Sequence, residues 1–129
     1  MNLATQFLVY LIEKDTDITK VIRDLCDEKS LQLRCFNSSD ELLDAVQNHK
    51  PSCIITANDR PNGQALNLMD KLANQKQEVS VIILGVHNDV TSAVAAIKAG
   101  ALDYIEKPTV YGRLAENLNQ IMKRSVSQP

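Results

Sequence analysis

The feature that most constrains the fold is a fivefold alternation between short apolar runs and segments with helical spacing. A short continuous apolar run is typical of a strand buried on both faces of a sheet. We expect strands at residues 7–12, 31–36, 52–56, 79–86 and 102–106. After each of them, apolar residues recur three and four positions apart, as on one face of a helix. These sets are Ile18, Val21, Ile22 and Leu25; Leu42, Leu43 and Val46; Leu66, Met69 and Leu72; Val90, Val94 and Ile97; and Leu114, Leu118 and Ile121.

This alternation predicts an α/β fold. Strands that alternate with helices at such spacing form a parallel sheet covered by helices on both faces. Right-handed crossovers leave few topologies, and a common one at 129 residues is the flavodoxin-like, doubly wound (βα)5 fold, with five parallel strands in the order 2-1-3-4-5. We expect a single domain over residues 1–124, with residues 125–129 as a tail or the start of a linker.

Local signals mark several helix ends. Ser38 followed by Glu41 matches a capping box before the second helix. Asp89 is expected to cap the fourth helix, and Gly100 to end it in the left-handed conformation. The last helix is expected to end near Arg124.

Composition excludes several classes of function. The net charge is −2 with interspersed signs, so no basic stripe for nucleic acid is present. Cys26, Cys35 and Cys53 are odd in number and lack C-x-x-C spacing, which favours core thiols in a reducing compartment over disulfides or zinc. His49 and His87 have no second ligand at metal spacing. The first residues resemble neither a signal peptide nor a membrane span, and we expect a cytoplasmic protein.

Chemistry is expected where the strands end. Doubly wound sheets bind ligands at the carboxyl ends of their strands. In this chain those ends carry residues 13–15, 57–59, 85–87 and 106–108.

One string within this pattern is specific. Residues 81–108 read VIILGVHNDVTSAVAAIKAGALDYIEKP. This stretch resembles the receiver domain of two-component response regulators, in particular the FixJ-like transcriptional regulators, and the likeness extends over nearly the whole chain. The resemblance implies acidic residues that hold Mg²⁺ after the first strand and a phosphorylated aspartate at the end of the third. It also implies a Thr or Ser ending the fourth strand and a Lys ending the fifth, both contacting the phosphoryl group, and an aromatic switch residue.

Part of that pattern is retained. The lysine falls on Lys107 and the switch aromatic on Tyr104, three residues earlier. The resemblance implies a cis peptide bond before Pro108.

The reactive positions depart from the pattern. The acidic pair falls on Glu13 and Lys14, the phosphoacceptor on Ala57, and the Thr or Ser on Gly85. Ala57 has no nucleophile, and Mg²⁺ prefers anionic oxygens. We therefore predict a degenerate, or pseudo-, receiver that is not an enzyme and has lost its Mg²⁺ site. The ammonium of Lys14 is a candidate substitute for the metal, tying Glu13 or Asp59 to this pocket.

The expected function is regulatory. The resemblance implies docking or dimerisation through the fourth helix, the fifth strand and the last helix, in a phosphorylation-independent module of transcriptional control. The residues expected on that face are Val94, Ala95, Lys98, Asp103, Ile105 and Arg113. The partner is a protein or a second copy, with no membrane and no direct nucleic-acid contact, and a fused or separate DNA-binding effector is compatible with the resemblance.

Two alternatives remain open. In the first, Asp59 or Asp15 acts as an atypical phosphoacceptor. In the second, the vacated pocket at Glu13, Lys14, Ala57, Gly85 and Lys107 binds a small ligand or anion as a sensor.

Overall fold

Each expected apolar segment forms a strand, and each strand is followed by a helix. The structure is a computed structural model and describes residues 7–58 and 64–127. The elements are β1 (Leu8–Ile12), α1 (Thr16–Glu28), β2 (Gln32–Phe36), α2 (Ser39–Asn48), β3 (Cys53–Asn58), α3 (Gln64–Asn74), β4 (Ser80–Gly85), α4 (Val90–Lys98), β5 (Asp103–Glu106) and α5 (Tyr111–Ser127).

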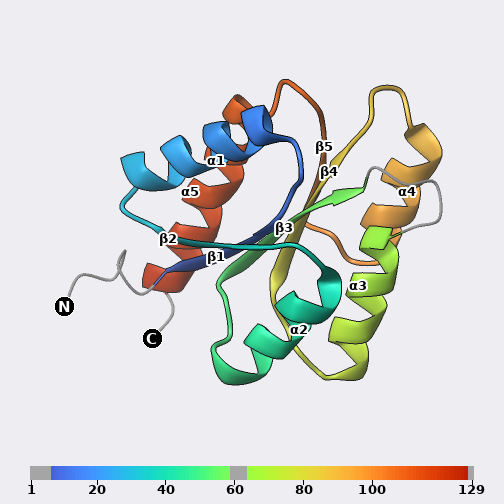
Figure 1. The fold of residues 1–129 in the computed structure, drawn as a ribbon, viewed down its shortest axis with the longest axis horizontal. Helices are drawn as coiled ribbons and strands as arrows, with labels where there is room; N and C mark the ends of the chain where they lie inside the picture. Colours follow the sequence, from blue (N-terminus) through green and yellow to red (C-terminus); the bar gives the residue numbers. More distant parts are fainter. Residues whose placement is uncertain (1–6, 59–63, 128–129) are drawn as a thin grey trace.

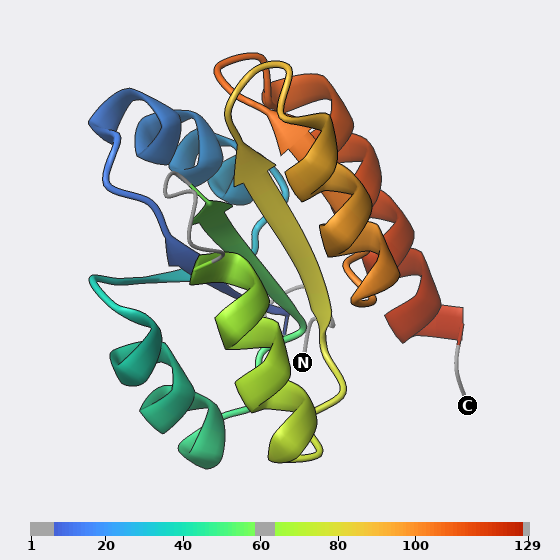
Figure 2. The ribbon, with the colours of Figure 1, turned by 90° about the vertical axis from the view of Figure 1, so that its right-hand side faces the viewer.

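The five strands form one parallel sheet in the order β2-β1-β3-β4-β5, which confirms the predicted topology. Helices α1 and α5 cover one face, and α2, α3 and α4 cover the other (Figures 1 and 2). β3 lies in the centre, and all six of its residues are buried. A central strand is apolar on both sides because each face packs against helices.

The sheet separates two hydrophobic cores. Alternate residues of a strand point to opposite faces. On β1, Val9 and Leu11 join the core beneath α1 and α5, whereas Tyr10 and Ile12 join the core beneath α2, α3 and α4. Each core is continuous along its face, so both faces contribute to folding.

The helix ends follow the expected chemistry with one change. Asp89 accepts a hydrogen bond from the backbone N–H of Ser92, and Gly100 has a φ of +103°, as predicted. Ser38 accepts from the backbone N–H of Glu41, but the Glu41 carboxylate accepts from Asn37 rather than from Ser38. The capping box is therefore closed one residue earlier than its usual form.

Helix α4 directs its large apolar residues outward. Val90, Val94 and Ile97, the apolar residues at helical spacing, are 70%, 47% and 51% exposed. Ala96 is buried instead, and Ala93 packs partly against the core. Both faces of this helix are apolar, so spacing alone does not distinguish them. The smaller alanines face the sheet, and the valines and Ile97 remain in solvent.

Smaller corrections concern burial and helix length. On α3, Ala65 and Leu68 are buried where Leu66 is only half-buried. Cys35 is exposed because β2 is an edge strand, so it is not the core thiol that we expected. Helix α5 continues to Ser127, past the expected end near Arg124. Across the described part of the chain, no helix combines the length and apolar character needed to cross a bilayer.

Candidate functional site

The carboxyl edge of the sheet brings together residues that lie far apart in the sequence. Glu13 follows β1, Ala57 and Asn58 end β3, and Gly85 ends β4 beside Asn58 in the strand register. Lys107 follows β5, and its backbone N–H donates to the Gly85 carbonyl. Those of the predicted site residues that the structure describes therefore lie at one edge, as parallel topology requires.

A buried ion pair crosses this edge. Lys107 Nζ lies 3.0 Å from Glu13 Oε1, and the side chains are 15% and 0% exposed. The second carboxylate oxygen of Glu13 accepts from the backbone N–H of Asp15 at 3.1 Å. Both oxygens of Glu13 are thus engaged within the protein.

Lys14 and Asp15 take other roles. Lys14 is exposed and forms no ion pair within the described residues; it lines a cavity of about 280 Å³ between α2 and α3. Lys107, not Lys14, holds Glu13, so the expected tether to Glu13 is wrong. Asp15 caps α1 by accepting from the backbone N–H groups of Asp17 and Ile18, a role that the spacing of Asp15 before Ile18 could have suggested. Asp59 lies outside the described residues.

The end of β3 presents no free carboxylate among the described residues. Ala57 is buried and offers only a methyl group. Asn58 is buried, and its Oδ1 accepts from the backbone N–H of Ala65 at 3.3 Å, which ties β3 to the first turn of α3. Sequence reasoning did not single out Asn58, although Asn between a strand and a helix is a common capping signal.

Gly85 makes room for Tyr104. A Cβ atom at position 85 would lie 1.7 Å from the Tyr104 hydroxyl oxygen and 2.0 Å from its Cζ. Tyr104 is 6% exposed and belongs to the core beneath α2, α3 and α4. The sequence left the ring orientation open; the structure shows it turned inward, in space that any larger residue at position 85 would need.

The last two elements carry further contacts. The peptide bond between Lys107 and Pro108 is cis, as the resemblance implied. Asp103 binds both Arg113 and Asn117, and His87 Nδ1 lies 2.7 Å from Glu106 Oε2. This His87 contact was not expected from the sequence, because it depends on the pairing of β4 with β5.

The six residues predicted for the interaction face differ in exposure. Val94, Lys98 and Arg113 are exposed, and Ala95 and Asp103 are half-buried. Ile105 is 1% exposed and belongs to the core beneath α1 and α5, so it is not a surface residue. Position 105 points to the opposite side of β5 from Tyr104, as strand alternation requires.

A cavity connects the face with the carboxyl edge. It has a volume of about 700 Å³, and its lining includes Ala93 of α4, Tyr104, Lys107 and Arg113 of α5. Tyr104 therefore lines both the carboxyl edge and the cavity between α4 and β5.

The described residues do not fit a magnesium ion. Mg²⁺ requires several free oxygen ligands in octahedral geometry. Here Glu13 is neutralised by Lys107, the Asp15 Oδ1 atom caps α1, and Asn58 Oδ1 holds α3. Within residues 7–58 and 64–127, no three His, Cys, Asp or Glu side chains come together as a metal site.

Comparison with known proteins decides the family. Residues 9–119 match the response regulator receiver domain. The chain belongs to the response regulator receiver family. Two-component signalling is therefore the context of this receiver domain.

Individual relatives agree. The chain is 30% identical over 101 residues to the response regulator protein TmoT of Ectopseudomonas mendocina, covering 78% of this chain and 46% of TmoT. It is 24% identical over 123 residues to the transcriptional regulatory protein FixJ of Bradyrhizobium diazoefficiens, covering 95% of this chain and 60% of FixJ. The receiver thus spans about half the length of these relatives.

Solved structures share the fold. The signal receiver domain of a LuxO repressor protein from Vibrio parahaemolyticus superimposes with a TM-score of 0.80 at 24% identity, covering 92% of each chain. At this identity the likeness extends to the fold alone.

Proposed function

We propose that this receiver domain signals without aspartyl phosphorylation, as a protein-docking module in a two-component-type regulator of transcription. The observation that carries the proposal is the chemistry at the end of β3. Ala57, where the family resemblance places the phosphoacceptor, has a methyl side chain and cannot attack a phosphodonor. In this proposal the domain performs no catalysis.

The contacts around Ala57 also support signalling without phosphorylation. In-line phosphoryl transfer relies on positioning and on electrostatic stabilisation of the developing charge. Lys107 and Glu13 neutralise each other across the pocket, and Gly85 contributes no hydroxyl group. A sensor ligand in the vacated pocket is disfavoured because Glu13 and Lys107, two of the residues expected to line that pocket, are already paired with each other.

The output surface is the apolar side of α4. Val86, Val90, Val94 and Ile97 are large hydrophobic residues with 45% or more of their surface exposed. Contiguous exposed apolar side chains favour contact with another protein. Tyr104 already lies inward beside Gly85, and we infer that docking does not require a phosphorylation-driven change.

The names of relatives indicate the pathway. TmoT is a response regulator, and FixJ is a transcriptional regulatory protein. Because both are longer than this chain, we propose that the receiver acts with a fused or separate DNA-binding effector in the cytoplasm.

A phosphorylation assay tests the proposal. The purified chain is incubated with acetyl phosphate and Mg²⁺ beside a receiver that has an aspartate at the acceptor position, and intact masses are compared. We expect the control to gain a phosphoryl group and this chain to remain unchanged. A magnesium-dependent mass gain that disappears in Asp59→Asn would overturn the proposal in favour of Asp59 as acceptor; retention in Asp59→Asn would point to Asp15.

Sedimentation tests the docking surface. We expect a concentration-dependent association that neither reagent changes and that Val94→Glu weakens. Lys20→Glu on α1, an exposed site on the opposite face, is the matched control and should leave association intact. Association that responds to acetyl phosphate would contradict phosphorylation independence.

A further inference from the structure

A further cavity lies at the opposite end of the sheet from the site described above. Its volume is about 660 Å³, within the roughly 300–1,000 Å³ range of small-molecule sites. Leu8 and Gln32 are the first residues of β1 and β2, and His49 and Lys50 precede β3. The cavity therefore opens at the amino ends of the strands, away from Glu13 and Lys107.

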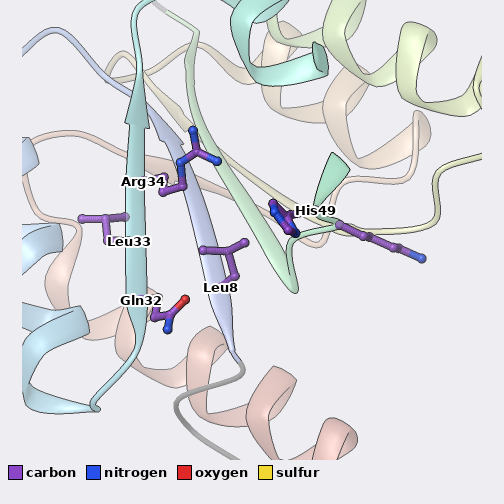
Figure 3. Close-up of a pocket in the computed structure, with 6 residues that line it drawn as sticks. Leu8, Gln32, Leu33, Arg34 and His49 are labelled. Carbon is purple, nitrogen blue, oxygen red and sulfur yellow. The ribbon is translucent and has the colours of Figure 1, made fainter. Parts of the chain in front are cut away.

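The cavity exists because α2 is short. Its buried residues, Leu42, Leu43 and Val46, cover the part of the sheet near Tyr10 and Ile12, and the helix ends at Asn48. On the face covered by α2, α3 and α4, no helix of the described chain therefore covers the amino-terminal part of β1 and β2. Figure 3 shows Gln32 and Arg34 of β2, Leu8 of β1 and His49 around this space, while Leu33 points to the other side of β2.

The lining is cationic. Arg34 and Lys50 carry positive charges, and no Asp or Glu lines the cavity. Neither Arg34 nor Lys50 forms an ion pair within the described part of the chain. This local excess of positive charge occurs in a protein whose net charge is −2.

Arg34 is held in place by aromatic rings. Its guanidinium carbon lies 5.1 Å from the centroid of the Phe36 ring and 5.7 Å from that of Tyr10, and the two rings meet edge to face at 4.8 Å. Cation–π contacts of this kind orient a guanidinium while leaving its N–H donors available. The Tyr10 hydroxyl donates to the His49 carbonyl at 2.7 Å, so the same ring also anchors the opposite wall.

We propose that this cavity binds a small organic anion through a carboxylate or phosphate group. The fork of Arg34 matches the planar geometry of either group, and Lys50 adds a second positive charge. Gln32 and His49 supply further polar contacts, and Leu8 provides an apolar wall for the body of the ligand. The site shares no residue with the proposed docking surface or the carboxyl edge, so its failure would leave the proposed function untouched.

Titrations followed by amide NMR test the site, with inorganic phosphate, succinate and AMP as probes and adenosine as the uncharged control. We expect saturable shifts at Leu8, Gln32, Arg34 and His49 with at least one anion and none with adenosine. Equal binding of phosphate and AMP would show that the anionic group alone is recognised. Preference for AMP would show that the organic body contributes, and preference for succinate that the site selects carboxylates.

Matched variants locate the binding. Arg34→Met keeps an apolar chain over the rings but removes the charge, and we expect about a tenfold or greater loss of affinity. Lys14→Met makes the same charge change at the cavity between α2 and α3 and should leave affinity unchanged. If Arg34→Met does not fold, exposed Lys50→Gln replaces it, with a several-fold loss expected. Absence of saturation for all three anions, or equal losses in Arg34→Met (or its replacement Lys50→Gln) and Lys14→Met, would overturn the site.

Discussion

At the residue scale, two pairs decide the character of the carboxyl edge. Lys107 and Glu13 are paired away from solvent, and Tyr104 occupies the space beside Gly85. In both pairs, the role of one residue becomes clear only from its contact with the other. A glycine at position 85 appears as a lost hydroxyl in the sequence, but in the structure it is the space for an aromatic ring.

Replacement of Gly85 by alanine should therefore destabilise the domain. The new methyl group would overlap Tyr104. Overpacking of a core lowers the free energy of unfolding by about 1–3 kcal/mol. Urea unfolding measures the loss. In the background of Tyr104→Ala the same change should cost clearly less, because the clash is gone. Equal costs in the two backgrounds would show that Tyr104 does not fill this space.

Removal of one partner of the buried ion pair should also be costly. We expect Lys107→Met to lower the free energy of unfolding by about 3–5 kcal/mol, since it leaves the Glu13 carboxylate buried without its cation. The double variant with Glu13→Gln should recover part of the loss. Lys20→Met, which breaks an exposed pair with Asp24, is the control and should cost no more than about 1 kcal/mol.

Thiol ionisation gives a pH prediction. Burial raises the pKa of Cys26 from 9.0 to about 11. The unfolded chain therefore loses this proton first, and the free energy of unfolding should fall as pH rises from about 9 towards about 11. Cys26→Val should reduce that slope in unfolding measurements, and buried Cys53, whose pKa burial also raises, should account for the part that remains. An unchanged slope in Cys26→Val would refute the assignment.

At the element scale, α4 differs from the other helices. Its only fully buried residue is Ala96, while α2, of similar length, buries Leu42, Leu43 and Val46. A helix that buries so little apolar area depends more on its termini. The Asp89 cap, whose hydrogen bonds to Ser92 lower the pKa of its carboxyl group, then matters more than the cap of α2.

Asp89→Ala should loosen α4 selectively. Loss of the N-cap leaves the first-turn N–H groups without their partner, and here it should appear as faster amide exchange in α4 with little change in the β-sheet. Ser38→Ala removes the corresponding cap of α2, and we expect a smaller acceleration there because the helix is anchored by its core residues. Equal acceleration in the two helices would contradict this difference.

At the scale of the whole molecule, the domain presents two surfaces with different chemistry. One is the apolar side of α4, and the other is the cationic cavity at the amino ends of β1 and β2. The first lies beside the carboxyl edge of the sheet and adjoins Tyr104 through the cavity between α4 and β5. A partner at the first surface and an anion at the second would leave each other's residues free.

The apolar surface should bind a hydrophobic reporter dye in the folded protein. We expect dye fluorescence to fall in the double variant Val94→Glu and Ile97→Glu, with a melting temperature close to that of the parent because both side chains are about half exposed. A large drop in melting temperature would show that these residues contribute to the core instead. Leu118→Ala, in the core beneath α1 and α5, serves as the contrasting case and should cost about 2–5 kcal/mol.

Much of this protein was determined by the sequence alone. The alternation of short apolar runs with helical spacing specified the order of the elements and the parallel sheet, because each pattern is local and extends over a few residues. Asp89 and Gly100 were assigned correctly for the same reason, since caps depend on immediate neighbours. The absence of a nucleophile at Ala57 is a matter of residue type and needs no coordinates.

Only the tertiary structure decided which residues meet. The choice of Lys107 over Lys14 as partner of Glu13, the inward turn of Tyr104 and the exposure of Val94 and Ile97 all depend on distances between separate elements. The cationic cavity likewise requires β2 to lie beside β1 with α2 ending early. Periodicity describes one element at a time, whereas contacts between elements are set by how closely side chains of different size can pack.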